Sequence, residues 1–232
     1  MPNLDSFFLN RSKTGVRDSA PTPAGGAARF FYLAYTHFAK LVGVNILFLL
    51  FSIPIITVPA ALSGMNRVCV LLVREGTASV WSDFISEFKC SFLKSLPLGL
   101  LCAFLFADSA LCLFLGMTAN YSGLMPVLLL AATVLAIAAI LLGSAVFVLM
   151  PLVALKNGDI LRDALFLVMK EPKTDLLLIV VVGGWLTAAV LLLPFSIPVV
   201  AMFGLSLVSL ATCTILYGPV NKHILDKANE IS

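Results

Sequence analysis

Two ionisable side chains, Arg67 and Asp108, lie within the long apolar stretches of the sequence. Either charge alone would cost about 2.5–3.5 kcal/mol or more at the centre of a bilayer. If the helix that carries Arg67 starts near Val58 and the helix that carries Asp108 ends near Met117, both lie roughly 13 Å from the same membrane face. The sequence therefore predicts an intramembrane Arg67–Asp108 ion pair, which either fixes helix register or lines a substrate or proton pathway.

Other polar residues in apolar surroundings are expected to support this pair. Ser63 and Asn66 could satisfy its remaining donors and acceptors, and Asn45 is expected to form a hydrogen bond between helices. His37 and His223 have no further ligand at metal-binding spacing, so neither a metal nor a cofactor is expected. The five cysteines contain no CxxC pair and are interpreted as small apolar side chains.

The composition indicates the elements that must position these residues. The chain is 60% hydrophobic and 12% charged, and its mean hydropathy is +1.06. Residues 109–155 and 176–221 carry no charge, and each range is long enough for two spans of about 20 residues. This pattern excludes an ordinary soluble domain, gives no support to nucleic-acid binding, and predicts an all-α, polytopic integral membrane bundle in the lipid bilayer.

The number of predicted spans depends on whether the chain turns back within the apolar stretch 41–74. Pro54, Thr57 and Pro59 interrupt the apolar stretch 41–74 and predict a hairpin turn. The motif Phe51-Ser-Ile-Pro54 recurs as Phe195-Ser-Ile-Pro198 between two later spans. We therefore predict six transmembrane helices, with five as the alternative, at about 38–53, 58–74, 95–117, 124–150, 176–193 and 198–217.

The distribution of cations supports the hairpin. With it, every lysine and arginine except Arg67 lies on the cytoplasmic side, as the positive-inside rule requires. The predicted domains are a flexible cytoplasmic tail (1–29), a transmembrane domain (30–221) and a cytoplasmic C-terminal end (222–232). Aromatic residues at helical spacing from Phe30 to Lys40 predict a helix at the membrane interface that turns into the first span.

An amphipathic segment, 80–92, separates the second and third predicted spans. Trp81, Phe84 and Phe88 share one face of it, and polar residues occupy the other. We interpret it as a separate cytoplasmic helix that either lies on the membrane surface as a connector or docks a partner subunit.

Motifs of catalysis are absent from the sequence. It contains no HExxH, GxSxG, phosphate-binding loop or dinucleotide fingerprint, and its predicted cytoplasmic loops are too short for a separate catalytic domain. An enzyme is therefore not expected.

The first predicted hairpin resembles a known family. The residues that carry the resemblance are Asn45-Ile-Leu-Phe-Leu-Leu-Phe-Ser-Ile-Pro54-Ile-Ile-Thr57-Val-Pro-Ala-Ala, the helix Val68-Cys-Val-Leu-Leu-Val-Arg74, and Val80-Trp-Ser-Asp83-Phe84-Ile-Ser-Glu-Phe88. They resemble the YesL-like family of bacterial membrane proteins, although that family often has glycine where Pro59 stands. The resemblance implies a helical fold in the bacterial cell membrane and an uncharacterised function. It also implies an accessory or regulatory role near carbohydrate uptake, because family genes often lie beside carbohydrate transporter genes.

Two functions remain open at this point. One is a non-enzymatic accessory protein that contacts a carbohydrate ABC transporter or a signalling membrane protein through the Trp81, Phe84 and Phe88 face. The other is a small secondary transporter or channel with a polar site at Arg67 and Asp108, because proline-broken helices and buried charges also occur where transporters bind substrates.

Overall fold

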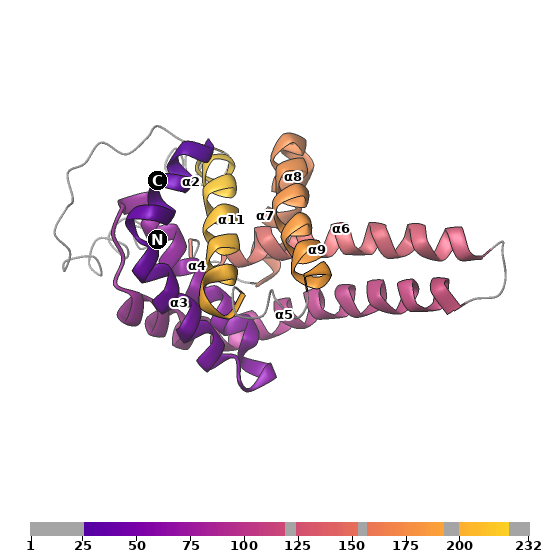
Figure 1. Ribbon diagram of the computed structural model, residues 1–232, viewed down its shortest axis with the longest axis horizontal. Helices are drawn as coiled ribbons and strands as arrows, with labels where there is room; N and C mark the ends of the chain where they lie inside the picture. Colours follow the sequence, from indigo (N-terminus) through magenta and orange to yellow (C-terminus); the bar gives the residue numbers. More distant parts are fainter. Residues whose placement is uncertain (1–25, 119–123, 153–156, 193–199, 223–232) are drawn as a thin grey trace.

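The structure is a computed structural model that describes residues 26–118, 124–152, 157–192 and 200–222. Within these ranges it consists of helices and contains no strand (Figure 1). The α-helices are α2 (Gly26–Thr36), α3 (Phe38–Phe51), α4 (Val58–Glu75), α5 (Val80–Thr118), α6 (Met125–Leu149), α7 (Asn157–Lys170), α8 (Pro172–Leu178), α9 (Gly184–Leu191) and α11 (Leu205–Val220). A 3₁₀ turn, η1 (Ile55–Thr57), precedes α4, and π-helical segments η2 (Ile179–Gly183) and η3 (Val200–Gly204) precede α9 and α11.

The predicted polytopic all-α fold is confirmed. Among the described residues, five helical stretches are long and apolar enough to cross a membrane: Ile55–Glu75, Val80–Thr118, Met125–Leu149, Pro172–Leu191 and Met202–Val220. A sixth is counted if α2 and α3, which are bent by 81° relative to each other, form one span. Most of the predicted tail, the Phe195–Pro198 repeat and the C-terminal end beyond residue 222 lie outside the described residues.

The chain reverses direction between α3 and α4. A Cβ placed on Gly43, near the start of α3, would lie 3.5 Å from Val80, which follows the end of α4. The two helices are therefore antiparallel. The hydroxyl of Thr57 donates hydrogen bonds to the carbonyl oxygens of Phe51 and Pro54, so it closes the turn between them.

The segment 80–92 is not a separate helix, which corrects the sequence prediction. It continues without a break into the apolar half of α5, which is 39 residues long. Neither glycine nor proline occurs from Val80 to Leu96, so nothing in the local sequence ends the helix before Pro97. The polarity of the side chains changes along α5, but the backbone stays helical from Val80 to Thr118.

α5 is not straight. A Cβ on Gly64 would lie 3.1 Å from the carbonyl oxygen of Phe84, and one on Gly99 would lie 2.2 Å from the ring of Pro59. A straight helix would separate Phe84 from Gly99 by about 22 Å, whereas the five-residue step between their partners on α4 covers only about 8 Å. α5 therefore curves around α4, and Pro97, which lacks an N–H, lies where such a bend is tolerated.

The distal halves of α5 and α6 form an arm, residues 100–118 and 125–143, that projects from the rest of the molecule (Figure 1). The helices hold together through Ser109, whose hydroxyl donates to the carbonyl of Ala132 at 2.9 Å, and through Gly116, which packs against Leu128 and Leu129. Large apolar side chains cover its outside, including Leu100, Phe104, Phe114, Leu130 and Val134. α8, α9 and α11 run across the direction of the arm (Figure 1).

The core lies around α4, where most residues from Ala60 to Val73 are buried. It includes side chains from α3, the end of α6, α7 and α11. An aromatic cluster formed by Phe51, Phe84, Phe88 and Phe92 joins the end of α3 to the start of α5, with ring centroids 4.9–6.4 Å apart. α4 is therefore the central helix of the molecule, and its polar side chains are held inside it.

Candidate functional site: a buried polar network around α4

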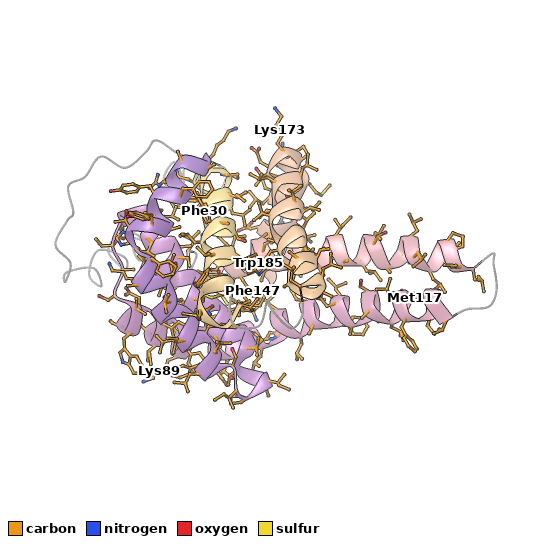
Figure 2. The ribbon with its side chains drawn as sticks, in the orientation of Figure 1. Phe30, Lys89, Met117, Phe147, Lys173 and Trp185 are labelled. Carbon is orange, nitrogen blue, oxygen red and sulfur yellow. The ribbon has the colours of Figure 1, made fainter. Side chains whose placement is uncertain are left out.

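Asn66 joins three helices. Its amide nitrogen donates to the carbonyl oxygen of Phe147 on α6 at 3.0 Å, and its amide oxygen accepts from the hydroxyl of Ser209 on α11. The same hydroxyl lies 3.3 Å from the sulfur of Cys69, one turn further along α4. Figure 2 places Phe147 where α6 meets α11. Asn66 was predicted to support an ion pair, but it instead ties α4 to α6 and α11.

Arg67 reaches the end of α6. Its guanidinium donates to the carbonyl oxygen of Pro151 at 2.9 Å, and 6% of the residue is exposed. A carbonyl just beyond a helix C-terminus carries partial negative charge, so it suits a buried cation. Arg67 thereby anchors α4 to the segment in which the α6 helix ends.

The predicted Arg67–Asp108 ion pair is wrong. Ser109, beside Asp108, contacts Ala132, whereas Arg67 contacts Pro151. The helical stretch from Ala132 to Leu149 alone is about 25 Å long. The equal depths assumed for the pair required the α3–α4 turn to lie level with Met117, but Pro59 packs against Gly99, near the middle of α5.

Replacing Arg67 by methionine, which keeps most of the length of the side chain, should remove the charged donor from Pro151. A hydrogen bond to a charged group contributes about 1.5–3 kcal/mol. We expect a loss of about 2 kcal/mol in unfolding free energy, measured by SDS titration of the purified protein in mixed micelles. Lys94→Met, an exposed site on α5, is the matched control and should change stability little; equal stability of both variants would contradict the role of Arg67.

Glu87 is a buried acid that sequence reasoning missed. One of its carboxylate oxygens accepts hydrogen bonds from the hydroxyls of Ser63, at 3.1 Å, and Ser91. The residue is 8% exposed. Glu87 lies on the polar side of the segment 80–92, which was expected to face water. In the structure α4 covers that side, so the carboxylate is buried. Ser63 therefore supports Glu87 and not the predicted ion pair.

Asn45 forms a bridge between helices, at a break in helical geometry. Its amide nitrogen donates to the carbonyl oxygen of Val200 at 3.0 Å, and its amide oxygen accepts from the backbone N–H of Ser206 at 3.2 Å. These groups flank the change from π-helix η3 to α11. Since a π-helical segment disturbs the regular hydrogen-bond pattern, an external amide is needed to satisfy the groups around it.

Replacing Asn45 by alanine should leave both backbone groups without this partner. We expect a loss of about 1–2 kcal/mol in unfolding free energy, in the range of hydrogen bonds between membrane helices. Hydrogen exchange should also become faster at the backbone amides around Ser206. Ile46→Ala, the neighbouring residue, which is 56% exposed, is the control; unchanged exchange in Asn45→Ala would count against the bridge.

The predicted docking face made of Trp81, Phe84 and Phe88 is wrong. Phe84 is fully buried, and Phe88 packs between the rings of Phe51 and Phe92. Trp81 is 63% exposed. The face that looked free in the sequence covers the α3–α4 hairpin, because α5 curves around it.

Among the residues that the structure describes, no three His, Cys, Asp or Glu side chains lie together in a way that could hold a metal ion. The five cysteines are free thiols, and His223 lies outside the described residues. The chemistry of the network is hydrogen bonding between helices.

Most side chains of the network fall within one recognisable segment of the chain. Residues 41–108 match the family model described as "Protein of unknown function, DUF624". This segment runs from α3 into the arm and includes Asn45, Ser63, Asn66, Arg67 and Glu87. No curated protein and no solved structure matches the chain. The DUF624 segment thus coincides with the hairpin and with most of the side chains that hold it in place.

Proposed function

We propose that the protein is a non-enzymatic accessory or regulatory component of the bacterial cell membrane, of the YesL-like kind, that acts in carbohydrate uptake. It would contact a carbohydrate ABC transporter or a signalling membrane protein within the bilayer. The observation that carries this proposal is the arm, whose two helices pack against each other and leave their outer surfaces exposed (Figure 1).

The polar network supports a structural interior. The side chains of Asn45, Asn66 and Arg67 bond to backbone carbonyl oxygens of neighbouring helices, and Glu87 bonds to two serine hydroxyls. Groups that bind a substrate must exchange partners during turnover. Groups that hold helices together keep theirs. The partners named here are all groups of the protein itself, which supports the second role.

The arm is a better partner surface than the face around Trp81. Its outer side chains include Leu100, Phe104, Phe114 and Leu130, which are 64–68% exposed. Helices in a membrane associate by close packing and not by burial from water, so an apolar arm can exchange lipid for a partner helix at little cost.

Photo-crosslinking tests this proposal. With p-benzoylphenylalanine in place of Phe104, we expect an adduct with a membrane subunit of a carbohydrate transporter, identified by mass spectrometry. The same group in place of Phe84, which is fully buried, should give none. Deletion of the gene should also lower the rate of labelled sugar uptake. Adducts with lipid alone, together with unchanged uptake, would contradict the proposal.

A small secondary transporter or channel is the second candidate. Two π-helical segments, η2 and η3, interrupt apolar stretches of the chain, and such segments are frequent at functional sites. Asn45 contacts one of them. Proteoliposomes that contain the purified protein should then accumulate labelled sugar faster than empty vesicles, and Asn45→Ala should slow this accumulation. Equal rates in loaded and empty vesicles would contradict transport.

A further inference from the structure

We infer that the arm docks a membrane helix of another protein, that this helix carries a lysine or arginine near the middle of its span, and that Asp108 pairs with that cation. The inference rests on the function proposed above, because it names the chemistry of the partner that the arm would contact.

Asp108 is an isolated charge in the middle of the arm. Residues 100–118 and 125–143 contain no other Asp, Glu, Lys or Arg. Asp108 lies about 14 Å along α5 from Gly99 and about 15 Å from Thr118. It is half-buried, and within the described part of the chain no group forms a hydrogen bond or ion pair with its carboxylate. Because ionisable residues in apolar spans are costly and usually paired, its partner is expected in another molecule.

The contacts between α5 and α6 leave Asp108 on an open flank of the arm. α5 meets α6 through Cys102, Ser109 and Gly116, which follow one another at intervals of seven residues. Asp108 precedes Ser109 by one residue, and this step turns it about 100° around the helix. Its side chain therefore lies beside the α5–α6 contact and not within it.

Asp108 is the central residue of an apolar docking seam. The other members, Leu101, Phe104, Leu111 and Leu115, lie before and after it at alternating spacings of three and four residues. They are 38%, 64%, 54% and 44% exposed. This spacing is typical of residues that line the contact between two packed helices, where a single polar side chain selects the partner. The docking seam therefore has the pattern of one half of a helix pair.

The surface of the arm gives Asp108 no polar side that could face water. Large apolar residues are exposed on other faces of both helices, among them Leu100, Leu113, Leu130 and Val134. A helix that lies at a membrane surface needs a polar face opposite its apolar one, and the described residues of the arm form no such face. Lipid therefore surrounds Asp108 until another helix covers it, whatever the tilt of the arm.

The charge of Asp108 decides between the possible occupants of the docking seam. Asp108 lies at its centre, so two copies of this chain joined through it would bring two carboxylates together in either orientation, which is unfavourable. Arg67 cannot neutralise Asp108, because it is buried and donates to Pro151. A cation on a helix of another protein removes the cost of the isolated carboxylate, and the apolar residues of the seam pack against the same helix.

A pair of synthetic membrane helices tests the inference directly. Each peptide has about 20 leucine and alanine residues, and the two differ only in a central lysine or leucine. The protein carries p-benzoylphenylalanine in place of Leu111, one turn from Asp108, and is reconstituted with either peptide in phosphatidylcholine vesicles. We expect about tenfold more photo-adduct with the lysine peptide, as an ion pair between membrane helices would give. Equal yields from the two peptides would overturn the inference.

Two controls separate pairing from general stickiness and from misfolding. Asp108→Asn keeps the shape of the side chain but removes the charge, so the preference for the lysine peptide should disappear. The same photoreactive group in place of Leu113, which is 47% exposed on another face of α5, should show no preference in the parent protein. Asp108→Asn should also leave the unfolding free energy in SDS titration unchanged. A loss of stability would mean that Asp108 holds the arm together, and the inference would be wrong.

Crosslinking in cells separates this inference from the proposed function. With p-benzoylphenylalanine at Phe104, Asp108→Asn should lower the yield of the partner adduct about tenfold, and the crosslinked peptide should contain a lysine or arginine within an apolar stretch. A transporter adduct that survives Asp108→Asn would leave the proposed function standing and overturn the inference. A charge-dependent adduct with another membrane protein, together with unchanged sugar uptake, would do the reverse. Adducts between two copies of this chain, or with lipid alone, would also overturn the inference.

Discussion

Replacing Phe84 by alanine should lower the unfolding free energy by about 3–5 kcal/mol, as expected for removal of a fully buried aromatic ring. The ring touches Gly64 of α4 and packs near Phe51 and Phe88, so its removal leaves a cavity where α3, α4 and α5 meet. SDS titration in mixed micelles measures the loss, with helical content followed by circular dichroism. We expect the α3–α4 hairpin to detach from α5 before the remaining helices unfold.

Trp81→Ala is the matched control, because Trp81 lies three residues away on the same helix and is 63% exposed. It should change the unfolding free energy by less than about 1 kcal/mol. If the control were as destabilising as Phe84→Ala, the aromatic face would not divide into buried and exposed parts as the structure has it.

Replacing Gly99 by leucine should destabilise the protein by about 3 kcal/mol, because overpacking of a closed contact forces the backbones apart. The first atom of the new side chain would lie 2.2 Å from the ring of Pro59, and a proline ring has little freedom to move aside. The α3–α4 turn should therefore separate from α5. Protease cleavage near the turn, with the protein in mild detergent, should become faster together with the loss of stability.

Gly184→Leu provides the control for Gly99→Leu. A Cβ on Gly184 would meet nothing within 4 Å, and the residue is exposed on α9. We expect stability equal to that of the parent protein or slightly greater, since leucine favours a helix over glycine. A double variant, Gly99→Leu with Pro59→Ala, should recover part of the lost stability if the clash with the ring is the cause. Absence of recovery would indicate another origin.

The all-α membrane fold could be predicted because hydropathy is a local property. A stretch such as 109–155 carries no charge and is too long for one buried helix of a small soluble domain, so its length and composition predict two membrane helices. Pro54 and Pro59 likewise mark a turn by their own geometry, and the chain reverses there. These conclusions require no knowledge of neighbouring helices.

The partners of buried polar groups could not be predicted in the same way. Arg67 and Asp108 have opposite charges in apolar surroundings, and their pairing followed only if both helices extended equally far from one face. Arg67 is instead satisfied by a backbone carbonyl, that of Pro151. Every residue carries a carbonyl, so such a partner has no signature in the sequence.

The burial of the face formed by Trp81, Phe84 and Phe88 also could not be predicted from the sequence. Helical spacing placed Trp81, Phe84 and Phe88 on one side of α5 but gave no information on what covers that side. The curvature of α5 brings Phe84 against Gly64 and leaves Trp81 at the edge of the contact. Glu87 was missed for the same reason, because its burial depends on where α4 crosses and not on its neighbours along the chain.

The sequence by itself determined that this chain is a helical membrane protein and that it turns back at Pro54. It also determined where the predicted spans begin and end to within a few residues, except at the start of α5. Tertiary structure alone decided which helices touch, how far each extends along its neighbours, and therefore which polar side chains meet. The physical reason is that the cost of placing a residue in water or lipid is a property of that residue, whereas a contact between helices depends on their crossing and relative depth. The crossing and the relative depth of two helices are set jointly by many residues, among them Gly99 and Pro59.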